Sequence, residues 1–195
     1  MNDNRKFIID RENLPPLYPT HRHSSEFWEQ LGRTVATFGF LEEVLGKAIF
    51  AFTATKNYNS EDIEKACYAW LGKLELALTG ELFSLAECYG KAVRENEAST
   101  FKDIDLLVDD IKKAAKIRNV LCHASWRAPD QGGKSIPLFV QKKTLEKFET
   151  AVDIDFLRQV RKYVVDLACC VIDSVTVMGW QFPGGAGPGE PIIKI

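Results

Sequence analysis

Apolar residues recur at intervals of three and four along most of this chain, which is the spacing of amphipathic α-helices. The first such stretch begins near Ser24 or Ser25 and continues to about Thr55. Its apolar stripe consists of Leu31, Val35, Phe38, Leu45, Ile49 and Phe52. We therefore expect a long first helix with one face packed against the core.

Two more helical stretches follow. The second opens with Ser60-Glu61-Asp62, where a capping hydroxyl and two acids precede an apolar stripe, and Gly80 ends it. The stripe of this second stretch consists of Ile63, Cys67, Trp70, Leu71, Leu74 and Leu78. The third stretch ends near Glu95-Asn96-Glu97, and its apolar side consists of Leu82, Leu85, Ala86, Tyr89 and Val93. Both patterns predict helices of ordinary length.

Two last helices are predicted in the second half of the chain. Thr100-x-x-Asp103 resembles a capping box and is expected to open the fourth helix. The stripe of that helix consists of Ile104, Leu107, Val108, Ile111, Ala114 and Ala115. The final helix is expected to be capped by Asp153, to begin near Ile154 and to end near Gly179. Its stripe consists of Leu157, Val160, Val164, Leu167, Val171 and Met178.

The pattern changes between these two helices. Residues 125–128 and 136–140 read as short strands on either side of a turn at 129–133, which predicts a small β-hairpin at about 125–141. Pro137 would confine it to an edge. The fold class is therefore all-α, a bundle of four to five main helices with a small hairpin before the last one. This domain covers residues 24–180, between an extended lead-in at 1–23 and a glycine-rich, flexible tail at 181–195.

The composition indicates the broad class of protein but does not indicate a function. The 195 residues are 46% hydrophobic and 27% charged, which is typical of one globular domain. We find no apolar run near the roughly 20 residues of a membrane span and no signal-peptide core, so we expect a cytoplasmic protein with no membrane partner. The five cysteines show no metal-ligand or secreted spacing, and we expect reduced thiols that act as small core residues. With a net charge of −2, any contact with RNA must be short and local.

Two charged residues interrupt the apolar stripes. Glu42 lies four residues after Phe38 in the first helix, and Arg118 continues the stripe of the fourth. Burying an unpaired charge costs several kcal/mol, so the two helices are expected to face each other across an ion pair or a polar pocket. A pair that only fixes the register of the helices and a pair that belongs to a working site both fit this pattern.

The functional reading depends on His123. It lies five residues after Arg118, and five residues of a regular helix rotate by about 140°, so the two would share a face only if the helix ends or bulges there. Asn119, four residues before His123, could share its face. His with an unperturbed pKa of about 6.5 can transfer protons near neutral pH, and Arg offers a planar fork to a phosphate. These residue types fit the cleavage of a phosphodiester.

The segment Ile117-Arg118-Asn119-Val120-Leu121-Cys122-His123 resembles the signature of the HEPN superfamily. In these small helical bundles an Arg is followed by a polar residue and, after four to six intervening positions, by His. Arg118, Asn119 and His123 match this pattern at its shortest spacing, at the end of a late amphipathic helix. The motif covers about ten residues, and the expected architecture extends the resemblance over residues 24–180.

The resemblance implies a metal-independent endoribonuclease that needs no cofactor and acts as a prokaryotic toxin or abortive-infection effector. It implies RNA as substrate, a homodimer with the site at its interface, and a cognate antitoxin protein as a further partner. His123, Arg118 and Asn119 would be the catalytic residues. Glu42 would orient Arg118, and Trp126 would wall the pocket or stack on a base.

Two other readings remain open. Some members of the superfamily only bind nucleotides or act as scaffolds, so the chain could be a non-catalytic dimeric module that binds a nucleotide, RNA or a protein. The motif could also be accidental in a plain helical protein, because Arg-x4-His is a weak pattern by itself. His21-Arg22-His23 lacks an acidic or thiol partner nearby, which favours a flexible surface segment over a metal site.

Overall fold

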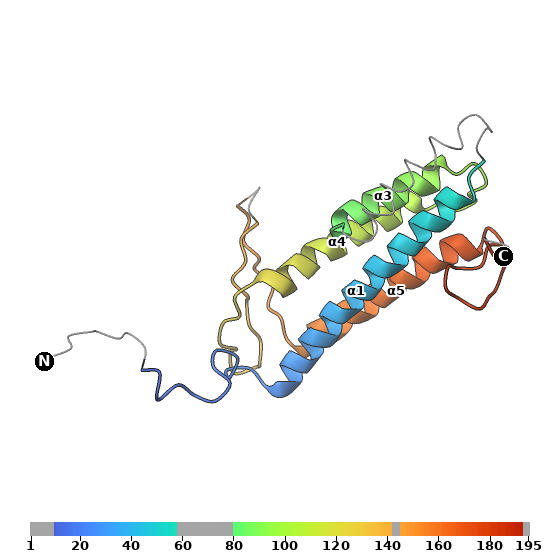
Figure 1. Ribbon diagram of the computed structural model, residues 1–195. Coiled ribbons are helices and arrows are strands. Elements are labelled where there is room, and N and C mark those ends of the chain that lie inside the picture. The colour runs from blue at the N-terminus through green and yellow to red at the C-terminus, as the bar shows by residue number, and fades with distance from the viewer. Residues whose placement is uncertain (1–9, 58–79, 142–144, 193–195) are drawn as a thin grey trace, which may run out of the picture.

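The computed structural model of the protein describes residues 10–57, 80–141 and 145–192. These residues form four α-helices (Figure 1). The helices are α1 (Ser25–Ala54), α3 (Leu82–Glu95), α4 (Ile104–His123) and α5 (Ile154–Thr176). The expectation of an all-α bundle is confirmed at this level. The helix predicted over about 60–78 lies outside the described residues.

Two of the helix starts lie where the sequence places them. Ser24 caps α1, since its hydroxyl accepts the N–H of Phe27 at 3.2 Å. Asp153 caps α5 by accepting the N–H of Phe156 at 2.8 Å. Each cap satisfies a backbone donor that the helix itself cannot pair.

The capping box predicted at Thr100 is wrong. The α4 helix begins at Ile104, and its cap residue, Asp103, makes no side-chain cap hydrogen bond. Residues 101–103 are not helical, and the side chain of Phe101 packs against the core. A partly buried aromatic side chain thus anchors the chain where it enters α4, in place of a hydroxyl cap.

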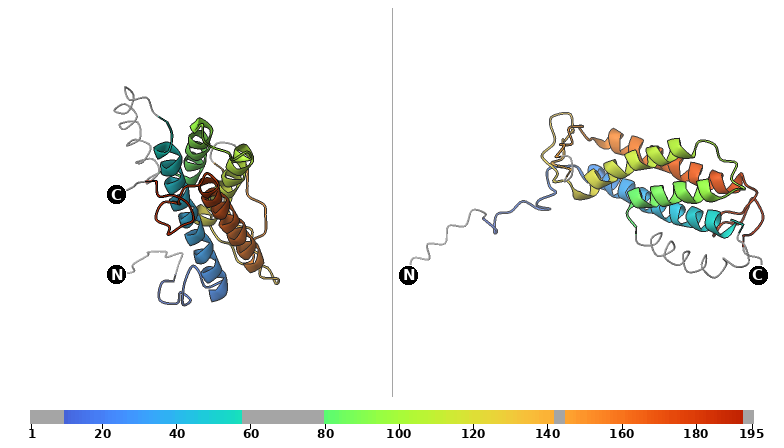
Figure 2. Two further views of the ribbon diagram at one scale, coloured as in Figure 1. Left: turned by 90° about the vertical axis from the view of Figure 1, so that its right-hand side faces the viewer. Right: turned by 90° about the horizontal axis from the view of Figure 1, so that it is seen from above.

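Of the four described helices, α1, α3 and α5 run in one direction and α4 runs in the opposite direction (Figures 1 and 2). The starts of α1 and α5 are joined by Glu26 and Arg158, whose carboxylate and guanidinium lie 2.7 Å apart. The ends of α1 and α3 are joined by Asn96, which donates to the carbonyl of Phe52 at 2.8 Å. The α1 helix packs most extensively on α5, and α3 packs on both α1 and α4. As a result, the C-terminal end of α4 lies near the start of α1.

The core is apolar except for a few paired polar groups. Its largest fully buried side chains are Tyr89, Phe27, Phe38, Phe52, Leu41, Leu45, Leu82, Leu85, Ile111, Leu157, Val93 and Val152. Tyr89 on α3 donates its hydroxyl hydrogen to Ser174 on α5 at 2.7 Å. A Cβ on Gly90 would lie 2.7 Å from Val108 Cγ2, so the close approach of α3 to α4 requires a glycine there.

The segment between α4 and α5 contains three isolated antiparallel bridges, and its described residues form no continuous strand. The bridges join Ser125 to Leu138, Ser135 to Val152 and Val140 to Lys147. Ser125 and Leu138 exchange both backbone hydrogen bonds, at 3.1 and 2.8 Å. Chain segments therefore do meet where a hairpin was predicted, but a regular β-hairpin is not confirmed.

The segments that directly precede α1 and follow α5 contact the bundle. Trp28 on α1 donates its indole N–H to the carbonyl of Thr20 at 2.8 Å. After α5, Gln181 donates to the carbonyl of Glu190 at 2.8 Å, and Phe182 and Ile192 pack against the core. None of the described helices has the length and apolar character needed to cross a membrane.

Candidate functional site

Glu42 and Arg118 meet across the interface between α1 and α4. Arg118 Nη2 lies 3.6 Å from Glu42 Oε1, and the two side chains are 28% and 27% exposed. The contact between the two interrupting charges that the sequence suggests is therefore present. It lies partly open to solvent, so the charges are only partly desolvated.

The Glu42 carboxylate is incompletely satisfied. Its Oε1 atom is buried and has no hydrogen-bond partner among the described residues, because the 3.6 Å separation from Arg118 is an ion pair too long for a hydrogen bond. Burial raises the pKa of the Glu42 carboxyl above its ordinary value of 4.5, and the charge of Arg118 offsets part of that rise. A cation or a hydrogen-bond donor that came closer would therefore stabilise the Glu42 carboxylate.

Arg118 also contacts its neighbour Asn119, with 3.5 Å between Arg118 Nη1 and Asn119 Oδ1. This is a weak hydrogen bond at the limit of the distance range. A guanidinium has five N–H donors, and in the described part of the protein the side chain of Arg118 contacts only Glu42 and Asn119 as polar partners. Arg118 thus keeps donors that could reach an oxyanion.

His123 is the last residue of α4 and is exposed. The helix is regular up to that point, and Ala124 closes it by donating to the carbonyl of Val120 at 2.9 Å. The five-residue separation therefore rotates His123 by about 140° from Arg118, and no bulge brings them onto one face. Asn119 lies one turn before His123 and is also exposed, so these two share a face. Within the described residues, the His123 ring makes no hydrogen bond or ion pair.

Trp126 packs against the start of α1. Its ring centroid lies 5.1 Å from that of Phe27, 6.1 Å from that of His23 and 6.4 Å from that of Trp28, in edge-on arrangements. This aromatic cluster fixes the backbone that follows His123. The half-buried Trp126 therefore supports the region as a packing residue.

Sequence reasoning missed the role of His23. Its side chain is buried, and Nε2–H donates to the carbonyl of Arg127 at 2.8 Å, across 104 residues of sequence. The expectation that His21-Arg22-His23 forms a flexible surface segment is wrong for His23. No local signal could have identified a partner so distant in the chain.

Two of the basic residues near the motif are neutralised by ion pairs. Lys112 lies 3.1 Å from Glu87, and Lys113 lies 2.8 Å from Asp110. Of the lysines on α4, only Lys116 lacks an acidic partner among the residues that the structure describes. Any positive field at this end of α4 therefore comes from Lys116, Arg118 and Arg127.

The cysteines were expected in the core, and for most of those described this is wrong. Cys122, Cys169 and Cys170 are exposed free thiols, and Cys88 is partly buried. Cys67 lies outside the described residues. Cys122 lies one turn after Arg118, so a thiol adjoins the motif. Among residues 10–57, 80–141 and 145–192, no group of three or more His, Cys, Asp or Glu could hold a metal ion.

Comparisons with known proteins give no relative: no protein-family model, no curated protein and no solved structure matches the chain. The resemblance to the HEPN superfamily therefore rests on the motif and on the helical architecture.

Proposed function

We propose that this protein is a metal-independent endoribonuclease of the HEPN type that acts as a homodimer, as a toxin or an abortive-infection effector. One observation supports this most. The exposed ring of His123 has no partner in the described part of the chain and lies one helical turn after Asn119, which contacts the guanidinium of Arg118. An unpaired imidazole and an incompletely paired guanidinium at one helix end are suited to phosphodiester chemistry.

The proposed reaction uses the ribose 2′-hydroxyl as nucleophile. One His123 takes the 2′-hydroxyl proton as the oxygen attacks phosphorus, and a second imidazole delivers a proton to the 5′-oxygen as its bond to phosphorus breaks. The products are a 2′,3′-cyclic phosphate and a 5′-hydroxyl. Arg118 binds the non-bridging phosphate oxygens, whose charge increases in the transition state.

The helix geometry supports a dimer. Because Arg118 and His123 point about 140° apart on a regular helix, one chain cannot easily present both to the same phosphate from the same face. Two α4 ends facing each other across a two-fold axis could place Arg118 of one chain beside His123 of the other. Such an arrangement would also supply the two imidazoles that the reaction needs.

Glu42 is proposed as a positioning residue for Arg118. The 3.6 Å ion pair restricts where the guanidinium can lie while leaving it partly exposed. Asn119 would hold the same guanidinium from the other side through its Oδ1 atom. Neither residue needs to touch the reacting atoms to have this effect.

A second candidate is a non-catalytic dimeric module that binds a nucleotide, RNA or a protein. The Glu42–Arg118 ion pair favours it, because an ion pair between helices can be purely structural. In this reading the open donors of Arg118 bind an anion that is not cleaved.

RNA cleavage in excess EDTA separates these candidates. Wild type, His123→Ala and His21→Ala would be incubated with mixed RNA, and the product ends analysed. His21→Ala is the matched control, since His21 is a histidine outside the motif whose ring stacks on that of Tyr18. We expect cleavage that EDTA leaves unchanged, that yields cyclic phosphate ends, and that only His123→Ala abolishes. No cleavage by wild type, or full activity of His123→Ala, would contradict the proposal.

A further inference from the structure

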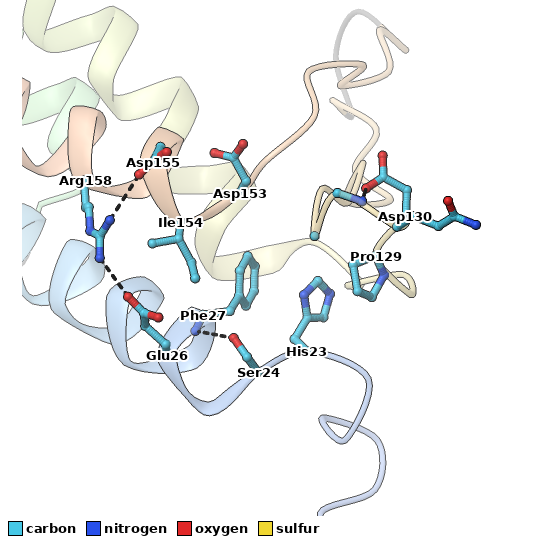
Figure 3. A pocket seen from close by; sticks show the side chains of 13 residues that line it. His23, Ser24, Glu26, Phe27, Pro129, Asp130, Asp153, Ile154, Asp155 and Arg158 are labelled. Atoms are coloured by element: carbon cyan, nitrogen blue, oxygen red, sulfur yellow. Dashed lines mark hydrogen bonds and ion pairs between the residues drawn. The ribbon is translucent and has the colours of Figure 1, made fainter.

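A cavity of about 530 Å³ lies at the end of the bundle where α1 and α5 begin (Figure 3). The first turns of both helices and the turn at 129–133 line it. None of Arg118, Asn119 and His123 contributes to its wall. Its volume falls in the range of small-molecule binding sites, about 300–1,000 Å³.

One wall of the cavity is held rigid by its own hydrogen bonds. Asp130 Oδ1 accepts the backbone N–H of Gly132 at 2.8 Å and that of Lys134 at 2.9 Å. The backbone of Asp130 also donates to the carbonyl of Lys134 at 2.8 Å. A ligand would therefore meet a preformed wall and would not have to order it.

His23 supplies a polar atom at the wall. Its side chain is 9% exposed and lies between Phe27 and Pro129 in Figure 3. Because a carbonyl can only accept, Nε2 is the donor to Arg127, and in the uncharged ring Nδ1 is then an acceptor. Nδ1 has no partner within the described parts of the chain. An acceptor on a ring that is nine-tenths buried and lines the cavity suits a ligand that carries N–H donors.

The charges around the cavity favour a cation. Arg158 lies 2.7 Å from Glu26 and 3.1 Å from Asp155, so two carboxylates share one guanidinium (Figure 3). Asp153 is paired with Lys134 at 3.6 Å. Asp130 has no cationic partner among the described residues. Four carboxylates thus face two cations, which leaves two negative charges uncompensated around the cavity.

The starts of two helices would by themselves favour an anion. Here a first-turn N–H of each helix is already capped, that of Phe27 by Ser24 and that of Phe156 by Asp153. The additional carboxylates of Glu26 and Asp155 offset the remaining partial positive charge. The excess charge that a ligand meets is therefore negative.

The lining also indicates the size of the cation. Within the described ranges, the carboxylates are too dispersed for any three of them to bind one metal ion. Phe27, Ile154 and Pro129 contribute apolar surface between the charged groups. We propose that this cavity binds a small linear organic cation of the polyamine class, with ammonium groups at the carboxylates and His23 Nδ1, and an alkyl stem on the apolar surface.

The test is calorimetric titration of the full chain with spermidine at low and at moderate salt. We expect one site per chain that weakens as salt rises. The variant Glu26→Gln/Asp155→Asn leaves Arg158 without an acidic partner, and we expect at least about tenfold weaker binding. These side chains are 53% and 77% exposed, so the variant should fold, which circular dichroism would confirm.

Glu29→Gln is the matched control, because Glu29 lies one turn further along α1, outside the cavity, and pairs with Arg33. It should bind spermidine as wild type does. No binding of spermidine, or equal weakening by Glu29→Gln, would overturn the proposal. Inorganic phosphate, titrated in parallel, should not bind; phosphate binding that the double variant strengthens would assign the cavity to anions instead.

Discussion

Two polar contacts between helices can be compared directly in this bundle. Tyr89 and Ser174 join α3 to α5 in the fully buried core through a 2.7 Å hydrogen bond, and Ser174 in turn donates to the carbonyl of Val171 at 2.6 Å. Glu42 and Arg118 join α1 to α4 at 3.6 Å and stay about a quarter exposed. Every hydroxyl donor in the first contact has an acceptor, whereas a buried oxygen of Glu42 has no hydrogen-bond partner among the described residues.

This difference distinguishes polar groups that only stabilise the fold from polar groups that can still bind a ligand. Burial raises the pKa of the Tyr89 hydroxyl well above its ordinary value, so this group stays neutral and serves only as a hydrogen-bonding core residue. Glu42 and Arg118 carry charges that the protein itself pairs only loosely. Loose pairing is what a site for an external phosphate requires, since a fully satisfied guanidinium would have to break contacts first.

Loss of the Tyr89–Ser174 contact should destabilise the protein most. Tyr89→Ala removes a fully buried ring and should lower the free energy of unfolding by about 3–5 kcal/mol. Tyr89→Phe keeps the ring and loses only the hydrogen bond to Ser174, so it should cost about 1–2 kcal/mol. Urea denaturation followed by circular dichroism measures both. If both variants were as stable as wild type, the core would not depend on this contact.

Loss of the ion pair between Glu42 and Arg118 should destabilise the protein less. Arg118→Met keeps an apolar stem but leaves the Glu42 carboxylate without its cation, and should lower the free energy of unfolding by about 1 kcal/mol at pH 7. Adding Glu42→Gln to Arg118→Met removes the unpaired charge and should restore most of the loss. A double variant no more stable than Arg118→Met would mean that the two side chains do not interact.

The smallest change in stability is expected from the titration of Glu42 with pH. The folded protein raises the pKa of Glu42 above 4.5, so between 4.5 and that raised value the folded state binds more protons than the unfolded state. The contribution of Glu42 to stability is therefore largest below pH 4.5 and falls as pH rises through that range. Relative to Glu42→Gln, wild type should lose stability between pH 4 and pH 7 in urea denaturation. An opposite slope would show that Arg118 outweighs burial and lowers the pKa.

The sequence predicts best what depends on neighbouring residues. The start of α1 at Ser24 and that of α5 at Asp153 follow from side chains that cap an N–H only three residues away. The cap of α4 was predicted wrongly, because Phe101, which follows Thr100, packs against the core and does not continue into the helix.

Only part of the candidate site could be predicted from the sequence. The charges of Glu42 and Arg118 stand out because periodicity demands apolar residues at their positions, and they do meet. The cavity beside His23 gave no signal, because it is assembled from segments more than a hundred residues apart. The exposure of three cysteines was missed because a small thiol fits either side of an amphipathic helix.

In the proposed reaction, Arg118 and His123 act on the same phosphate. The most direct measurement is the rate of RNA cleavage in EDTA under single-turnover conditions by wild type, Arg118→Ala, His123→Ala and the double variant. We expect each single variant to lose at least about a hundredfold in rate, and the double variant to lose little more than the worse single one, because residues that act as a unit are not additive. Losses that multiply, or a wild type that cleaves no RNA, would contradict a joint action of Arg118 and His123.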